Sequence, residues 1–235
     1  MACVSPPCFA QLPWSAGSPL PFHSSRPTTF FLSSAAPPFE PRRVTVRWQR
    51  PSHGWFKLNF DGSVYDDGSK RASIGGVIRD SNGRILLAFA ETTEHAPVGV
   101  VEARALIRGL RLALSCYMGR LVVEGDDLVL VRLLREEDTY MRIPPTMLQE
   151  IRVLLGRFSA YEVQHIYREG NQVADALCHE AYRSPGVWKG AVVLPQAAWE
   201  KAQDDASSVG HHRFYQTKAP SPFLRKDKEG EEKQI

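Results

Sequence analysis

The feature that most constrains the fold of this chain is the order in which strand-like and helix-like spacings of hydrophobic residues follow one another. Residues 55–61, 72–79 and 84–91 alternate as β-strands do, and the Asn-Gly pair of DSNG predicts a tight turn between the last two. Residues 100–118 then change to a helical period. Further elements follow in the order strand, helix, helix, strand and helix, at 120–125, 127–136, 144–158, 161–167 and 172–183.

This order predicts an α/β fold. Three consecutive strands form an antiparallel meander, and strands that follow a helix return parallel to a neighbour by right-handed crossovers. We therefore expect one mixed five-stranded sheet, three antiparallel strands and then parallel ones, with helices on both faces. The period of the first helix predicts a buried face made by Leu106, Leu110, Ala113, Leu114 and Tyr117.

We expect three regions along the 235 residues. Residues 48–190 form the domain. Residues 1–47 are rich in Ser and Pro with a first acid at Glu40, which is typical of a plastid transit peptide or of a disordered extension. We expect a chloroplast location, with the nucleus or cytoplasm as alternatives. Residues 191–235 read as a polar, poorly ordered tail, in which the adjacent His211 and His212 do not predict a metal site.

The charge distribution limits the classes of partner. The net charge of +3 arises in residues 1–47, whereas basic and acidic residues balance over 48–199, so the domain lacks the footprint of a tight nucleic-acid binder. No apolar run approaches the roughly 18 residues of a membrane span, so we expect no membrane association and a monomer. The four cysteines, at 3, 8, 116 and 178, follow neither a disulfide nor a zinc pattern.

The segment KLNFDGS, residues 57–63, reads as a half-buried strand with Leu58 and Phe60 on its apolar face. It ends with Asp61 and Gly62 where a strand could continue. Asp61 could simply start a turn, and Gly62 could let another part of the chain approach its backbone.

Three more acids stand at the ends of predicted elements. Glu102 lies on the apolar face of the first helix, where a carboxylate needs a partner, unless it only complements the helix dipole. Asp126 follows an apolar strand and could cap the next helix, a role also open to Asp127. Asp175 lies one turn into the last helix, after Asn171 as its expected N-cap.

In a sheet covered on both faces these positions can share one crevice at the strand ends. Two carboxylates about 4 Å apart repel by roughly 4 kcal/mol at an effective dielectric near 20, so such a cluster needs protons or cations. Oxygen ligands alone select Mg²⁺, with Mn²⁺ as a substitute, and Mg²⁺ recruits phosphate oxygens. Convergence of Asp61, Glu102, Asp126 and Asp175 would thus point to phosphodiester chemistry.

Four blocks in this order resemble the ribonuclease H family, and in particular the plant ribonuclease H-like module akin to that of retrotransposon polyproteins. The first block has the pattern W-x-x-P-x-x-G-x-x-K-x-N-x-D-G, from Trp48 to Gly62. The others are GGVIRDSNG, VEARALIRGLRLAL together with VVEGDDLVLV, and HIYREGNQVADAL, so the resemblance runs to about Tyr182.

The resemblance implies a ribonuclease H-like fold and an endonuclease that cuts the RNA strand of RNA–DNA hybrids with two Mg²⁺ ions. It implies that Asp61 touches both ions, that Asp175 helps to hold the one that activates water, and that Glu102 and Asp126 hold the other at the leaving oxygen. Sugar or phosphate contacts would come from Asn59, Gly62, Ser63, Gly75, Gly76 and Asn171. The Gly75-Gly76 pair could instead serve packing or a bulge, and Asn171 could be only a cap.

Three departures from the family pattern favour slow turnover or weak affinity. The turn REGN has no His, and His165 reads as a strand residue. Residues 127–143 have no basic, Trp-bearing protrusion, and residues 1–47 do not resemble a hybrid-binding module. A domesticated binding module with little or no catalysis is therefore the alternative, and a 3′ exonuclease is a weaker third hypothesis.

Overall fold

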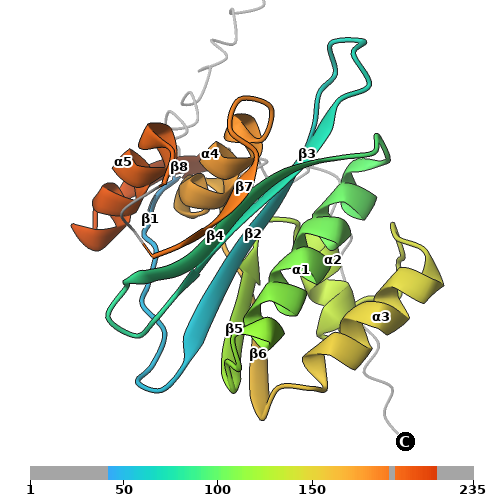
Figure 1. The fold of residues 1–235 in the computed structure, drawn as a ribbon, viewed down its shortest axis with the longest axis horizontal. Coiled ribbons are helices and arrows are strands. Elements are labelled where there is room, and N and C mark those ends of the chain that lie inside the picture. The colour runs from blue at the N-terminus through green and yellow to red at the C-terminus, as the bar shows by residue number, and fades with distance from the viewer. Residues whose placement is uncertain (1–41, 191–193, 216–235) are drawn as a thin grey trace, which may run out of the picture. The chain divides into compact units, whose positions relative to one another are not determined.

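The computed structural model describes residues 42–190 and 194–215. Its main feature is a six-stranded mixed sheet in the order β6-β5-β2-β3-β4-β7 (Figure 1). β2, β3 and β4 are antiparallel, β5 and β6 run parallel to β2, and β7 adds an antiparallel edge. The strands are β2 (Phe56–Val64), β3 (Ala72–Arg79), β4 (Ile85–Thr93), β5 (Arg120–Gly125), β6 (Ala160–His165) and β7 (Gly186–Lys189).

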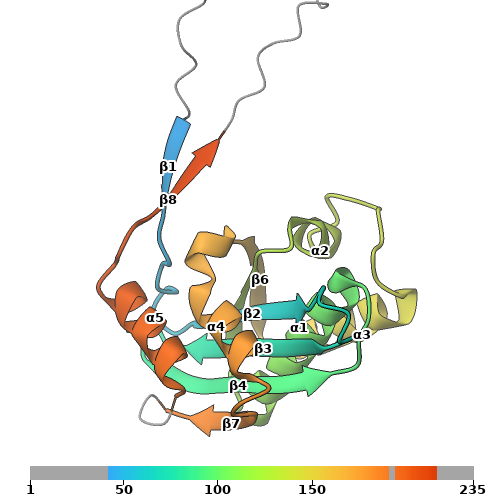
Figure 2. The same ribbon diagram turned by 90° about the horizontal axis from the view of Figure 1, so that it is seen from above.

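Helices cover both faces of this sheet (Figure 2). Leu58, Phe60 and Ile78 belong to the core on the side of α1, α2 and α3, whereas Val77 and Ala88 pack with α4 and α5. The predicted mixed sheet with helices on both faces is confirmed, with one strand more than expected. The helices are α1 (Val98–Ser115), α2 (Leu128–Leu134), α3 (Pro145–Leu155), the 3₁₀ turn η1 (Arg168–Gly170), α4 (Gln172–Glu180) and α5 (Gln196–Ala206).

The first strand of the sheet differs from the half-buried, shorter strand that was predicted. β2 continues through Asp61 and Gly62 to Val64, so Asp61 does not start a turn. Lys57, Asn59 and Asp61 are as buried as the apolar residues between them. The alternation is real, but polar side chains line an interior face that α4, α5 and Trp48 cover.

The predicted helical faces are largely confirmed. Leu106, Leu110 and Ala113 are fully buried, and one face of α3 is buried through Leu148, Ile151, Leu154 and Leu155. Leu114 is only half-buried, and Tyr117 is 95% exposed because α1 ends at Ser115 and Tyr117 has a positive φ of 55°. The prediction that Tyr117 belongs to the buried face is therefore wrong.

The domain extends beyond 48–190 at both ends. β1 (Arg42–Val46) pairs antiparallel with β8 (His211–Tyr215) in a separate two-stranded sheet. α5 is anchored by the buried Ala198 and Asp205, so the expectation of a poorly ordered tail is wrong for residues 196–215. The remaining parts of the predicted leader and tail, residues 1–41, 191–193 and 216–235, lie outside the described residues.

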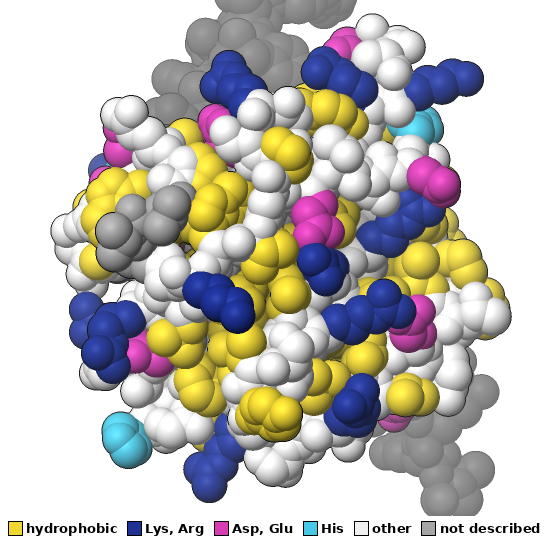
Figure 3. Space-filling model, viewed as in Figure 1, with side chains coloured by type: hydrophobic (Ala, Val, Ile, Leu, Met, Phe, Trp, Pro, Cys, Tyr) yellow, Lys and Arg dark blue, Asp and Glu magenta, His cyan; other side chains and the backbone are white. Residues whose placement is uncertain are grey.

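Within the described ranges, no helix combines the length and apolar character needed to cross a membrane. On the face drawn in Figure 3, Lys and Arg side chains alternate with acidic, polar and hydrophobic ones over α1, α3 and β4. This mixture agrees with the balanced charge counted along residues 48–199.

Candidate active site

Two neighbouring parallel strands bring the first two acids together. β2 and β5 pair with Asn59 opposite Glu124. Asp61 and Asp126 each lie two residues further along, so both stand at the same end of the sheet. The next residue, Asp127, caps α2 by accepting hydrogen bonds from the backbone N–H groups of Val129 and Leu130, at 2.8 and 3.2 Å. Because Asp127 serves as the cap, Asp126 is free for another role.

Glu102 joins these two acids because α1 packs directly on a glycine of β2. A Cβ atom on Gly62 would lie 2.5 Å from the backbone nitrogen of Glu102 and 2.6 Å from the carbonyl carbon of Val101. Only glycine therefore permits this approach of helix to strand. One carboxylate oxygen from each of Asp61, Glu102 and Asp126 then lies within 4.8 Å of the others.

Burial and mutual repulsion disfavour the charged forms of all three carboxyls. Burial, followed by the charges of Asp126 and Asp175, raises the pKa of Asp61 from 3.8 to about 7. Burial and then Asp61 raise the pKa of Glu102 well above 4.5, and burial also raises that of Asp126. The site therefore binds protons at neutral pH unless cations take their place.

The donor set fits hard divalent cations. Oε2 of Glu102 is buried and has no hydrogen-bond partner among the described residues, which is unusual for a buried carboxylate oxygen. Each of the three side chains offers oxygen, with no nitrogen or sulfur ligand in the group, as Mg²⁺ and Mn²⁺ prefer. The three acids could hold such an ion.

The fourth predicted acid, Asp175, stands beside the three-carboxylate group and is not part of it. Its charge raises the pKa of both Asp61 and Asp126. Asp175 accepts a 2.8 Å hydrogen bond from Arg168 and lies 3.6 Å from Nδ1 of His179. The predicted convergence thus holds for Asp61, Glu102 and Asp126, while Asp175 approaches from α4 with a partner of its own.

Arg168 and His179 are neighbours of the site that the sequence analysis did not identify. Arg168 belongs to the turn REGN, and its charge lowers the pKa of Asp61 and Asp126. His179 follows Asp175 by four residues, a spacing that places both on one face of a helix and could have revealed it. His165, by contrast, ends β6 with its ring 5.2 Å from that of Tyr167.

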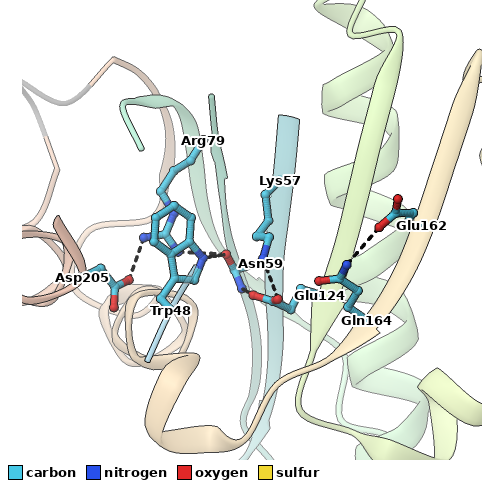
Figure 4. Close-up of polar contacts among 8 residues, drawn as sticks. All are labelled: Trp48, Lys57, Asn59, Arg79, Glu124, Glu162, Gln164 and Asp205. Atoms are coloured by element: carbon cyan, nitrogen blue, oxygen red, sulfur yellow. Dashed lines mark hydrogen bonds and ion pairs between the residues drawn. The ribbon is translucent and has the colours of Figure 1, made fainter. Parts of the chain in front are cut away.

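Asn59, which was predicted to contact sugar or phosphate, is instead a buried member of a polar network (Figure 4). Its Oδ1 accepts from Nε1 of Trp48 at 2.9 Å and from Arg79 at 2.8 Å, and its Nδ2 donates to Glu124 at 2.8 Å. Lys57 donates to the other oxygen of Glu124 at 2.7 Å. The network links β2 to β5 at positions two residues before Asp61 and Asp126.

The same network reaches α5 through Arg79. Its guanidinium stacks 3.6 Å from the ring centroid of Trp48 and donates to Asp205 at 2.6 Å. Both partners of this ion pair are nearly fully buried. The segment beyond residue 190 therefore supports the sheet that carries the site.

The other predicted substrate contacts also need correction. Gly75 is buried under α4, where a Cβ would lie 2.6 Å from the nitrogen of Cys178, and Gly76 is buried against the ring of Phe89. Both glycines therefore serve packing. Asn171 is buried, makes no side-chain cap, and donates to the carbonyl of Phe60 at 2.9 Å, so it links α4 to β2.

Two predicted contacts remain beside the acids. Gly62 is enclosed by α1, as described above, and serves the approach of Glu102. Ser63 is half-buried on β2, two residues beyond Asp61, and is the one member of the predicted set that stays partly accessible in the described structure.

Comparison with known proteins defines the class. A family model described as "Reverse transcriptase-like" matches residues 59–181, which include all four predicted acids. The chain belongs to this family, and its domain is ribonuclease H-like.

Particular relatives agree with this assignment. The chain is 27% identical over 137 residues to a candidate ribonuclease H protein of Arabidopsis thaliana, covering 58% of this chain and only 22% of the relative. It is 25% identical to ribonuclease H1 of the archaeon Halobacterium salinarum, with a TM-score of 0.50 over 55% of this chain and 98% of that one. The ribonuclease H domain of Mycobacterium tuberculosis rv2228c shares the fold, with 20% identity, a TM-score of 0.50, and coverage of 55% and 94%.

Proposed function

We propose that this protein is a metal-dependent endonuclease that hydrolyses the RNA strand of RNA–DNA hybrids. The observation that carries the proposal is the group of three carboxylates within 4.8 Å, in which burial and neighbouring acids raise the pKa of both Asp61 and Glu102. A cluster that is unfavourable by itself is expected where ions are to be bound.

The acids would divide two cations between them. Asp61, Glu102 and Asp126 would hold one ion, and Asp61 with Asp175 would hold a second. When bound, the ions would lower the pKa of an attacking water and neutralise the charge that develops on the leaving 3′ oxygen. The relatives named as ribonuclease H support the choice of substrate, in which 2′-hydroxyl groups distinguish RNA from DNA.

The protein's own side chains would prepare this site. Arg168 fixes one oxygen of Asp175 and leaves its second oxygen near His179. The salt bridge between Lys57 and Glu124 holds β5 against β2, which fixes the separation of Asp126 and Asp61. A site in which two groups of carboxylates each hold a cation requires rigid support of this kind.

The test is cleavage of a labelled hybrid by the full chain in Mg²⁺ or Mn²⁺. We expect RNA fragments with 5′-phosphates from the wild type and from Asp66→Asn, because Asp66 is exposed in the β2–β3 turn and makes no ion pair among the described residues. Asp61→Asn should reduce the rate by at least about 10³-fold, since it removes a ligand of both ions.

A binding module without catalysis is the second candidate, and one observation favours it. Asp175 already has Arg168 as a partner at 2.8 Å, so its availability to a cation is lower than that of the other acids. Hybrid that is bound but stays intact after long incubation with excess protein in Mn²⁺ would support this candidate over the nuclease.

A further inference from the structure

The strands that flank the domain form a ribbon with an unusual charge. β1 and β8 pair from Arg42 opposite Tyr215 to Val46 opposite His211. We call residues 42–50 and 207–215 the basic ribbon, because these segments contain no Asp or Glu. Their basic and titratable residues are Arg42, Arg43, Arg47, Arg50, His211, His212 and Arg213.

Much of this charge is not neutralised by the domain. Arg43, Arg47 and Arg50 are exposed, and none of them forms an ion pair with an acid in the described part of the chain. Elsewhere in that part, by contrast, several exposed arginines have a carboxylate partner, such as Arg111 with Glu150. The basic ribbon is therefore a local excess of positive charge on a domain whose residues 48–199 are balanced.

The ribbon is attached next to the candidate active site. His211 of β8 lies at 3.2 Å from the side-chain amide of Gln172, the first residue of α4. Arg213 of the same strand pairs with Glu169 of η1 at 3.1 Å. Asp175 follows Gln172 by one turn of α4, so the ribbon is fastened to the element that carries the fourth acid.

Two hollows are lined by residues of η1 or by those directly before it. One, of about 540 Å³, is lined by β1 and by the end of β6, with Thr45, Arg47 and Gln49 supplying polar groups beside Tyr167. The other, of about 370 Å³, is lined by Arg168, Asp175 and Lys201 among others. Guanidinium, amide and hydroxyl donors beside an aromatic ring suit sugar and phosphate groups.

We propose that the basic ribbon binds the phosphate backbone of the nucleic acid that enters the active site. This inference rests on the proposed function and names the surface that supplies its affinity. The stretch between α2 and α3 lacks a basic protrusion, and the ribbon supplies positive charge from a different place, built by chain segments on either side of the domain. Contacts of this kind add affinity without sequence preference.

The test compares the effect on hybrid binding of removing two positive charges from the ribbon with the effect of removing two positive charges elsewhere. Arg43→Gln/Arg47→Gln changes exposed side chains of the ribbon. Arg120→Gln/Arg157→Gln is the matched control, because both arginines are exposed and form no ion pair among the described residues. Arg120 begins β5, at the end away from Asp126, and Arg157 lies in the turn before β6, whose first residue pairs with Arg120. Binding of a labelled hybrid by the full chain is measured in EDTA from 50 to 300 mM salt, so that no cleavage intervenes.

We expect the ribbon variant to bind about 60-fold more weakly at 0.1 M salt, with a salt slope smaller by about 1.8, since each phosphate contact contributes about 0.9 to that slope. The control should keep the wild-type slope. A third variant, Arg43→Lys/Arg47→Lys, should retain most of the affinity, which separates charge from any change in the pairing of β1 with β8.

Several results would overturn the inference. These are equal weakening by the control, an unchanged slope in the ribbon variant, or wild-type protein that does not bind hybrid at 50 mM salt. Wild-type cleavage of hybrid is measured in parallel. If the wild type cleaves hybrid and the ribbon variant binds it as tightly as the wild type does, only the proposal for the ribbon is refuted. If binding depends on the ribbon but the wild type does not cleave, only the proposed nuclease activity is refuted.

Discussion

Replacing Asp61 with asparagine should stabilise the metal-free protein while it abolishes activity. Burial and neighbouring acids raise the pKa of Asp61 from 3.8 in the unfolded chain to about 7 in the fold. A carboxyl with a raised pKa contributes its full stability below pH 3.8 and loses it as the pH rises toward 7. The loss reaches about 4 kcal/mol above both values, at 1.36 kcal/mol for each pKa unit. Asparagine has nearly the same shape and never ionises.

The assay is urea unfolding, followed by tryptophan fluorescence in EDTA at pH 4, 6 and 8. The free energy of unfolding of Asp61→Asn should match the wild type at pH 4 and exceed it by about 2–4 kcal/mol at pH 8, where relaxation of the buried site can reduce the upper value. Asp66→Asn, with an exposed carboxylate, should show no such advantage. A variant no more stable than the wild type at pH 8 would refute the claim that these acids are mutually destabilising in the fold.

Three further predictions concern the supports of the site. Millimolar Mg²⁺ should raise the melting temperature of the wild type and leave Asp61→Asn unchanged, because an ion held at 100 times its dissociation constant adds about 2.7 kcal/mol; equal shifts in both would argue against a site at Asp61. Gly62→Ala should lose about 2 kcal/mol or more, because its Cβ would lie 2.5 Å from the α1 backbone, whereas Gly119→Ala, which meets only the side chain of Ser159 at 3.3 Å, should be nearly neutral in urea unfolding. Asp205→Ala should lose about 3–5 kcal/mol by leaving the buried Arg79 without its partner, and a loss no larger than that of the half-buried neighbour Asp204→Ala would contradict this role for α5.

The strand and helix pattern was sufficient to predict most of the domain. The turn DSNG joins β3 and β4. In this turn the Asp80 side chain accepts a hydrogen bond from the backbone N–H of Asn82, and Gly83 has a positive φ of 80°. Leu148, Ile151, Leu154, Leu155 and Phe158, which recur at helical spacing in and just after α3, are buried. These features depend on contacts within short segments or on one periodic face, which a local pattern records directly.

The missed elements depend on partners that are distant in sequence. β1 and β8 are separated by more than 160 residues. β8, with the sequence HHRFY, has no alternating apolar pattern, and the alternation in β1 is limited to Val44 and Val46. β7 has only four residues and is defined by its place beside β4. α5 was read as polar because its anchor is Asp205, whose partner Arg79 lies on β3. For Asp205 the sequence therefore indicates burial only when its partner on β3 is known.

The site shows the same division between local and distant information. Strand order placed Asp61 near Asp126, and the position of Glu102 on an apolar helix face was a signal that it points inward. Lys57 and Asn59 lie on the same face of β2 as Asp61 and are also buried. The prediction of a half-buried strand missed this, because alternation alone does not tell whether the polar face contacts water or a buried network.

That network explains why the acids can remain close without metal. Lys57 forms an ion pair with Glu124, so Glu124 adds no unpaired charge within β5. The repulsion is therefore among the carboxylates beyond it, which are Asp61, Glu102 and Asp126 with Asp175 beside them. The hydrogen bonds of Asn59 to Trp48, Arg79 and Glu124 hold the strands in register while those carboxylates repel one another. The raised pKa values of Asp61 and Glu102 show that their charged forms are unfavourable, and a bound cation would relieve this. The structural acids Glu124 and Asp205, by contrast, each have a basic partner. The same domain thus contains paired acids that stabilise the fold and acids without a basic partner that are available for chemistry.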